Sequence, residues 1–178
     1  SDHDVYAIGE CASWNEQTFG LVAPGYDMAR VVARHIAGEA DAAFVGADMS
    51  TKLKRMGVDV ASIGDAHGRT PKSRTCQYVD ERRQIYKKIV ISEDGKQLLG
   101  AVLIGDATEY GTLLQMALNG ITLPEDPEFL IFPSSDGKAK PGLGVEALPD
   151  TAQICSCNNV TKGAICAAVG EGVCTIGD

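Results

Sequence analysis

Two cysteines near the end of the sequence are spaced so that they could share one bound group. Cys155 and Cys157 flank a single serine in the segment ICSCNNVTKGAICAAVGEG. In an extended chain, side chains two residues apart point to the same face, so both thiols would point the same way. A disulfide between them would close a small, strained ring. A metal ion or an iron–sulfur cluster is the better candidate, although these thiols supply only two of the four ligands that such a site needs.

The other cysteines offer this pair no evident partner. Taken alone, the Cys-x-Cys spacing is weak evidence, because small buried thiols are common in protein cores. Cys166 lies in an alanine-rich run that predicts a helix, where we expect it to pack, and Cys174 has no assignment. Cys11 and Cys76 are predicted to be core or half-buried thiols. Six cysteines without disulfide-like spacing indicate reduced thiols and a cytoplasmic protein.

Composition places the chain among folded proteins. It has 178 residues, of which 44% are hydrophobic, enough for one domain or two small domains with cores. The net charge of −8 argues against nonspecific binding to nucleic acid or anionic membranes. No apolar run could cross a bilayer, and no signal peptide opens the sequence. Because Ser1 lies so close to a predicted strand, we expect a piece of a longer protein.

The charge is unevenly distributed along the chain. Residues 51–90 contain ten Lys or Arg and four Asp or Glu, a local net charge of +6, which leaves −14 for the remainder. These bases are interpreted first as the solvent faces of strands and loops. The alternative is a docking face for an acidic partner or a neighbouring domain.

Hydrophobic patterning near the start of the chain predicts one strand and one helix. The apolar run at residues 3–10 predicts a strand that ends at a sharp turn, and residues 25–39 carry apolar side chains at helical spacing. Gly38 is a plausible end for that helix. Strand, loop and helix in this order are typical of a doubly wound α/β layer.

The middle of the chain predicts antiparallel strands and one closing helix. Asp94-Gly95 is the signature of a hairpin between two of these strands. Residues 107–120 form an amphipathic helix that Asp106 or Thr108 can cap. The expected fold class is α+β, an antiparallel sheet with a packed helix, preceded by the last strand and helix of an α/β domain. The strands are predicted at residues 58–64, 75–80, 84–91 and 97–105, and the apolar stripe at Tyr110, Leu113, Leu114 and Ala117.

The last part of the chain predicts a linker and a short helix. Five of the seven prolines lie between residues 123 and 150, among Gly, Ser and Asp, which is typical of a linker. After it, Thr161 can cap a helix that runs to Ala168 and ends before Gly170.

Three segments resemble parts of known reductases. HDVYAIGECA, followed by GLVAPGYDMARVVA, is similar to the last strand and helix of the FAD-binding domain of pyridine nucleotide-disulfide-type reductases. STKLKRMGVDVASIGD, YKKIVI and LLGAVLIGDATEYGTLLQM together resemble the small C-terminal domain of the rubredoxin-reductase and nitrite-reductase branch. CSCNNVTKGAI resembles the opening of a bacterioferritin-associated-ferredoxin-like 2Fe-2S domain. Their order is similar to that in the large subunit of assimilatory NAD(P)H-dependent nitrite reductases.

The resemblance implies how the chain divides into domains. Residues 1–44 would be the end of the FAD-binding domain, and residues 45–123 the reductase C-terminal α+β domain. Residues 124–150 would be the linker, and residues 151–178 the first part of the 2Fe-2S domain.

The resemblance also implies which residues contact cofactors. A lone Gly-Glu pair is usually only a turn, but in this family an acid at the position of Glu10 binds the ribitol of FAD, and Gly9 lets the backbone pass close to it. The helix that begins near Gly25 would direct its N-terminus at the flavin. Cys155 and Cys157 would be two ligands of a 2Fe-2S cluster, completed by a later Cys-x-x-Cys that this sequence does not contain.

Other residues with suitable chemistry have simpler explanations. Asp65 and His67 in GDAHG have metal-ligand residue types, but turn formation explains them better. There is no Gly-x-Gly-x-x-Gly loop for a dinucleotide pyrophosphate, and no cysteine set for a sirohaem-coupled 4Fe-4S cluster. We therefore assign no catalytic residue and expect the chain alone to be inactive and to hold no cofactor tightly.

The function implied by the resemblance is electron transfer from NAD(P)H through FAD and iron–sulfur centres to sirohaem, where nitrite becomes ammonium. The implied partners are the remaining domains of the longer chain, a small subunit and a second copy, with neither nucleic acid nor membrane. Two alternatives stay open. One is the electron-transfer subunit of an assimilatory nitrate reductase, and the other is a module that serves only as an assembly surface.

Overall fold

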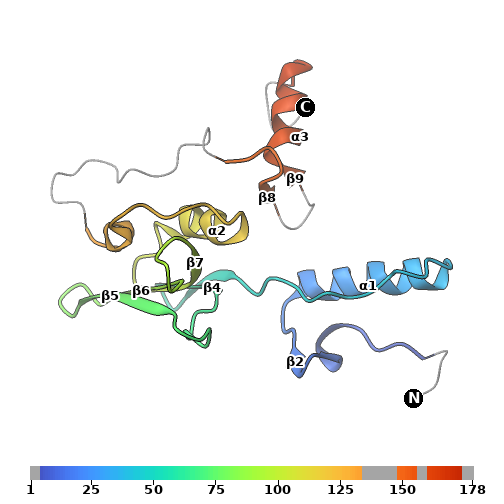
Figure 1. The fold of residues 1–178 in the computed structure, drawn as a ribbon, viewed down its shortest axis with the longest axis horizontal. Helices are drawn as coiled ribbons and strands as arrows, with labels where there is room; N and C mark the ends of the chain where they lie inside the picture. Colours follow the sequence, from blue (N-terminus) through green and yellow to red (C-terminus); the bar gives the residue numbers. More distant parts are fainter. Residues whose placement is uncertain (1–4, 134–147, 156–159, 174–178) are drawn as a thin grey trace. The chain divides into compact units, whose positions relative to one another are not determined.

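The computed structural model describes residues 5–133, 148–155 and 160–173 (Figure 1). It divides the chain into two compact units, Ser1–Met49 and Ser50–Asp178, which are described separately below. Among the described residues, no helix is long and apolar enough to cross a membrane.

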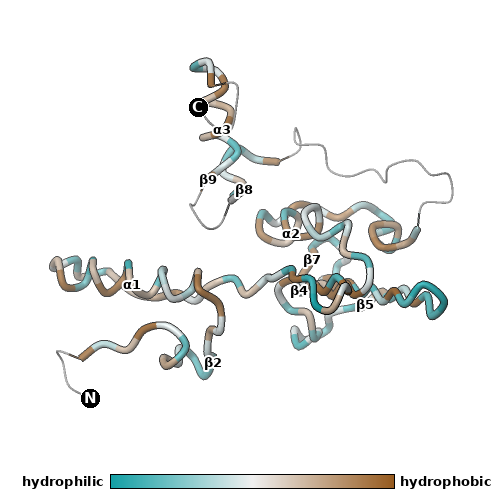
Figure 2. Tube along the Cα trace, turned by 180° about the vertical axis from the view of Figure 1, so that it is seen from behind, coloured by the Kyte–Doolittle hydropathy of each residue, from teal (hydrophilic) through white to brown (hydrophobic). Residues whose placement is uncertain are grey.

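The first unit contains one long helix and a two-stranded hairpin. Strands β1 (Ser13–Trp14) and β2 (Gln17–Thr18) pair antiparallel, and helix α1 (Val22–Ile36) follows them. Apolar and polar stretches alternate along α1, as the colours in Figure 2 show. The helix begins three residues before the predicted start at residue 25. Pro24 does not prevent this, because proline in the first turn removes an N–H that has no partner within the helix.

The strand predicted at residues 3–10 does not form within the described residues. The backbone is extended at Ile8, with φ −136° and ψ 157°, and then Gly9–Cys11 makes the 3-10 turn η1. None of the described strands pairs with the segment before this turn. The prediction was wrong because an apolar run records a preference for burial, whereas a strand also needs a neighbouring backbone for its hydrogen bonds.

The second unit is built on a five-stranded antiparallel sheet, which confirms the predicted fold class. The hairpin at Asp94-Gly95 joins β6 to β7 as predicted, with Gly95 at φ +76°. The edge strand β3 was not predicted, because most of its side chains are polar and exposed and give no buried apolar pattern. In spatial order the strands are β3 (Thr51–Arg55), β4 (Val58–Gly64), β7 (Leu98–Ile104), β6 (Ile85–Ile91) and β5 (Arg74–Asp80).

One face of this sheet is covered by helix α2 (Tyr110–Leu118) and the short 3-10 turn η2 (Pro127–Leu130), as Figure 1 shows. Leu113 and Met116 of α2 are buried, and Tyr110, Leu114 and Ala117 pack against the same core. Leu130 and Ile131, from the predicted linker at residues 124–150, also belong to this core. The sheet residues of the core include Ala61, Ile63, Ile89, Ala101 and Leu103.

The predicted cap of α2 was wrong. The N-cap residue is Glu109, and no side chain caps the backbone there. Asp106 Oδ1 instead accepts hydrogen bonds from the amide and hydroxyl of Thr108, at 3.1 and 2.6 Å, which closes a turn just before the helix.

The C-terminal segment holds a short strand pair and a helix. Strand β8 (Gln153–Cys155) pairs antiparallel with β9 (Val160–Thr161), and α3 (Lys162–Gly170) follows. The hydroxyl of Thr161 accepts a hydrogen bond from the amide of Ala164 at 3.2 Å, which confirms the predicted cap. The helix extends two residues beyond Ala168.

Gly100 on β7 lets the loop after β4 cross the sheet closely. A Cβ at residue 100 would lie 2.7 Å from the amide nitrogen of Ala66, and closer still to the carbonyl group of Asp65. Because these are backbone atoms, they cannot rotate aside. We expect Gly100→Ala to lower the free energy of unfolding of this unit by about 1–3 kcal/mol, as overpacking usually does. Hydrogen exchange of the β6 and β7 amides measures this change.

Gly111 in α2 provides the matched control. A Cβ there would have nothing within 4 Å. Gly111→Ala should therefore raise stability, by up to about 1 kcal/mol, because alanine favours the helix over glycine. Equal exchange rates in the two variants would contradict the proposed backbone clash at Gly100.

Candidate functional site

The turn at Gly9 packs against the first turn of α1. The amide of Gly9 donates a hydrogen bond to the sulfur of Met28 at 3.2 Å. The helix also approaches the backbone of this turn at Gly25, where a Cβ would lie 3.7 Å from the Cα of Gly9. Gly9 has φ +78°, a left-handed conformation that favours glycine, and a Cβ placed on it would meet nothing within 4 Å. The backbone of the turn is therefore open to a ligand at Gly9.

Glu10 lies in the same turn and is exposed. A Cβ at Gly20 would lie 3.5 Å from its carboxylate oxygen Oε1, so the segment before α1 runs close to this side chain. Leu21 is the N-cap residue of α1, and its side chain makes no capping hydrogen bond. Leu21 therefore does not satisfy the first backbone N–H groups of the helix. Such a helix end favours electron-rich groups. The structure thus brings Gly9, Glu10 and the N-terminus of α1 close together, and their role at a flavin stays a prediction.

The cysteine pair lies largely outside the described residues. Cys155 is the last residue of β8, where only its backbone is described, and Cys157 and Cys174 fall in residues that are not described. Within the described ranges, no group of three or more His, Cys, Asp or Glu side chains could hold a metal ion. The ligand role of Cys155 and Cys157 therefore stays a prediction.

The other cysteines differ from their predictions in two places. Cys166 is exposed on α3, a helix with no buried residue, so the prediction that it packs was wrong. Cys11 is also exposed, and its thiol donates to the carbonyl oxygen of Ile8 at 3.3 Å within the η1 turn. Cys76 is half-buried beside the core, as predicted. Burial raises the pKa of its thiol.

Asp65 closes the loop after β4, which confirms the turn interpretation of GDAHG. Its carboxylate accepts hydrogen bonds from the amides of Arg69 and Thr70, at 2.9 and 2.7 Å, and from the hydroxyl of Thr70 at 2.6 Å. Burial raises the pKa of Asp65, but these hydrogen bonds outweigh it and lower the pKa to about 2. His67 is exposed.

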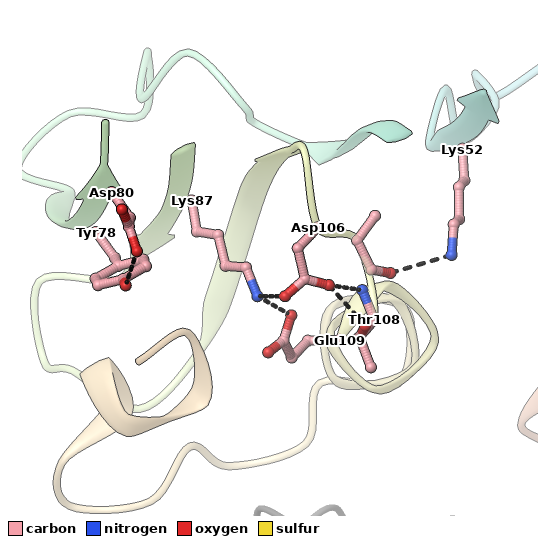
Figure 3. Close-up of polar contacts among 8 residues, drawn as sticks. Lys52, Tyr78, Asp80, Lys87, Asp106, Thr108 and Glu109 are labelled. Atoms are coloured by element: carbon pink, nitrogen blue, oxygen red, sulfur yellow. Dashed lines mark hydrogen bonds and ion pairs between the residues drawn. The ribbon is translucent and has the colours of Figure 1, made fainter. Parts of the chain in front are cut away.

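A buried ion network that the sequence did not reveal holds the start of α2 against the sheet. Lys87 on β6 is only 3% exposed, and its Nζ lies 2.7 Å from Asp106 Oδ2 and 2.6 Å from Glu109 Oε2 (Figure 3). Burial raises the pKa of Asp106, but hydrogen bonds from Lys87 and Thr108 outweigh it and lower the pKa to about 2. Lys52 on β3 donates to the carbonyl oxygen of Ala107 at 3.1 Å, a second link to this segment.

The network had one signal in the sequence. In QIYKKIVI, Lys87 stands two residues before Ile89 and two after Ile85, so it occupies the face of the strand that these buried isoleucines define. A lysine on a buried face needs an acidic partner. Asp106 and Glu109 could not be identified as those partners from spacing, because they come from a different element.

Helix α2 also contacts the segment that carries Cys155. The side-chain amide of Gln115 donates to the backbone carbonyl oxygen of Gln153 on β8 at 2.9 Å. The side-chain amide of Asn119 donates to Gln115 Oε1 at 2.9 Å and so orients that side chain. These polar contacts connect the α+β sheet layer to the C-terminal strand pair.

Comparison with known proteins identifies relatives along nearly the whole chain. Residues 50–121 match the family model of the rubredoxin NAD+ reductase C-terminal domain. The large subunit of the NADH nitrite reductase of Escherichia coli (strain K12) is 60% identical over 176 residues, which cover 99% of this chain and 21% of that protein. The NAD(P)H nitrite reductase large subunit of Klebsiella oxytoca is 62% identical over 172 residues, covering 97% of this chain and 18% of that protein.

A relative with lower sequence identity is described as part of a nitrate reductase. The assimilatory nitrate reductase electron transfer subunit of Bacillus subtilis (strain 168) is 34% identical over 165 residues, covering 93% of this chain and 20% of that protein. The chain spans about a fifth of the length of these curated relatives. The matched residues 50–121 contain the whole five-stranded sheet and α2, the same region in which the sequence resembled a reductase C-terminal domain.

Proposed function

From its homology to the large subunits of NAD(P)H nitrite reductases, we propose that this chain is part of such an oxidoreductase and joins its flavin-binding part to its iron–sulfur part. The observation that carries this proposal is identity of 60% and 62% over almost the entire chain. The reaction of the complete protein would be the reduction of nitrite to ammonium with electrons from NAD(P)H in the cytoplasm. Sirohaem and its 4Fe-4S cluster would be bound by residues outside this chain.

The residues at the start of α1 are suited to bind FAD. The carboxylate of Glu10 can accept hydrogen bonds from the ribitol hydroxyls, and Gly9 leaves space for the ligand against the backbone. The N-terminus of α1 favours an electron-rich ring edge nearby. These residues would bind and orient the flavin, while its pyrophosphate would be held elsewhere in the complete protein.

The C-terminal segment is suited to carry half of a 2Fe-2S site. Thiolates are the preferred ligands of such clusters, and Cys155 and Cys157 would supply two of them. The capped N-terminus of α3 follows directly and favours the negative charge of a thiolate-bound cluster. When bound, FAD would accept electrons in pairs and pass them on singly, and the cluster would carry single electrons.

The proposal also divides the chain into parts. Residues 1–44 would be the flavin part, residues 45–123 the α+β domain, residues 124–150 the linker and residues 151–178 the cluster part. Leu130 and Ile131, at the start of that linker, pack in the core of the α+β domain. The α+β domain would hold the two redox parts in one polypeptide, and the contact between Gln115 and Gln153 supports a positioning role for α2. The proposed partners are the other domains of the complete chain, a small subunit and a second copy.

The second candidate is the electron-transfer subunit of an assimilatory nitrate reductase, favoured by the 34% identical relative. Assays of the complete protein separate the two. We expect NAD(P)H oxidation that depends on nitrite and yields ammonium, together with bound flavin and iron. A protein that contains flavin and iron but passes electrons only to a separate nitrate-reducing subunit would contradict the nitrite reductase assignment.

The 178-residue chain alone should not retain either cofactor. Glu10 cannot replace a pyrophosphate-binding loop, and two thiolates cannot complete a four-ligand cluster in one chain. After gel filtration of the chain reconstituted with FAD, iron and sulfide, we expect flavin absorbance and iron content at background. Flavin that survives the column would contradict the first expectation. Stoichiometric iron and sulfide on a monomer would contradict the second.

A further inference from the structure

The face of the sheet opposite α2 carries an apolar row that crosses all five strands. Side chains of a strand alternate between faces, and residues next to this row in the sequence, among them Ala61, Leu103 and Lys87, point toward α2. The residues of the row therefore point the other way. Each member pairs with the next across the ladder: Leu53 with Val60, Val60 with Ile104, Ile104 with Tyr86, and Tyr86 with Val79. We call these five residues the open-face row.

The open-face row is accessible within the second unit. Val79 is 58% exposed, Leu53 44% and Ile104 36%. The loop after β4 covers the other end of this face, where a Cβ at Gly68 would lie 3.8 Å from a methyl group of Val90. The part of this sheet face that the loop does not cover is the part that carries the open-face row.

Single exposed apolar residues need no explanation, but a contiguous row does. Directly paired cross-strand side chains are neighbours, so the five members form one continuous strip. At the usual spacing of paired strands, four intervals span about 19 Å. Val58, 41% exposed, lies two residues before Val60 on the same face and widens the strip at the β3–β4 edge.

The charged strand residues that share the face of the open-face row have one sign. Arg55 and Lys88 are on this face, because they stand two residues from Leu53 and Tyr86 in their strands. The strand carboxylates face the other way: Asp59 precedes Val60, and Asp80 pairs with the buried Ile85. Among the described strand residues, this face thus combines apolar side chains with cations and has no acid.

We propose that the open-face row is the docking surface for another domain of the complete polypeptide, one that presents carboxylates around an apolar centre. Charge complementarity selects such a surface. A second copy docked through the same face would bring Arg55 and Lys88 of both copies into one interface that has no strand carboxylate to pair with them, which is unfavourable. The relatives contain about four-fifths of their length outside the matched region, so a covalently linked surface is available at high effective concentration.

This inference rests on the proposed function in one respect, that the complete protein is a much longer reductase. Hydroxyl-radical footprinting of the complete protein and of the 178-residue chain tests it. We expect modification of Leu53, Tyr86 and Ile104 to be several-fold lower in the complete protein. The protection should persist on dilution, because the docking is intramolecular.

A pair of charge reversals provides the control. Lys88→Glu, on the open face, should restore modification of Tyr86 in the complete protein, because it places an acid opposite acids. Lys96→Glu changes the charge equally but lies in the exposed turn between β6 and β7, and should leave the protection unchanged. Equal effects of the two reversals would overturn the charge argument.

The remaining outcomes separate the docking proposal from the proposed function. Protection that disappears on dilution would assign the face to a second copy and overturn the proposal. Unprotected side chains in a complete protein that binds flavin and reduces nitrite would also overturn it, while the proposed function would stand. A protected face in a protein without flavin or nitrite activity would support docking and contradict the function.

Discussion

Replacing Cys155 or Cys157 with serine is expected to remove the 2Fe-2S cluster from the complete protein while its flavin stays bound. A serine oxygen is a poor substitute for thiolate at iron, so either change should reduce the iron and sulfide of this cluster to background. Nitrite reduction should be abolished with it. NAD(P)H oxidation by an artificial acceptor should be retained, because that reaction needs only the flavin and Glu10 lies at the opposite end of the chain.

The matched control for these variants is Cys166→Ala. Its thiol is exposed on α3, so the variant should keep iron, flavin and both activities. Iron content, flavin content and the two activities are measured on the same preparations, with the spectrum of the cluster as an independent readout. A full iron complement in either serine variant, or loss of flavin from both, would contradict the ligand role of these cysteines.

Replacing Lys87 with methionine is expected to destabilise the second unit more than Gly100→Ala does. The change removes the cation between Asp106 and Glu109, whose side chains are 34% and 13% exposed. Breaking a buried ion pair on one side typically costs about 3–5 kcal/mol, because the remaining charge is left uncompensated. Hydrogen exchange of the β6 and β7 amides reports the free energy of unfolding of this unit.

The stability difference between the wild type and Lys87→Met should depend on pH. The pKa of Asp106 is about 2 in the folded protein, below its ordinary value of 3.8. A carboxyl group with a lowered folded-state pKa contributes stability above its unfolded-state pKa and loses it as the pH falls through the folded-state value. The difference should therefore shrink between about pH 4 and pH 2.

A triple variant provides the control for the ion network. Lys87→Met combined with Asp106→Asn and Glu109→Gln removes all three charges, and replacing a whole buried network is often nearly neutral. The triple variant should recover most of the lost stability. If the triple variant is no more stable than Lys87→Met, the cost would lie in packing around the lysine stem and not in the unpaired carboxylates. A difference between Lys87→Met and the wild type that does not change with pH would also count against the network.

The sequence by itself determined much of the second unit. Strands β4 to β7, their hairpin at Asp94-Gly95 and the two later helices follow from patterns within a few residues of chain, where apolar alternation and turn chemistry act directly. The Gly9-Glu10 turn and its position before a helix were predicted in the same way. Local rules failed for β3, whose polar edge carries no apolar signal, and for residues 3–10, which lack a partner strand among the described residues.

Only the tertiary structure decided which charges meet and which apolar residues stay uncovered. Asp106 and Glu109 are 19 and 22 residues from Lys87, and no local period relates a strand lysine to the start of a helix that crosses it. Alternation predicts that Tyr86 and Lys88 share a face, but the packing of α2 and η2 on the opposite face decides which side of the sheet is covered. Pairing registers then align Leu53, Ile104 and Val79 across strands far apart in sequence, because ladder hydrogen bonds, and not chain proximity, set their neighbours.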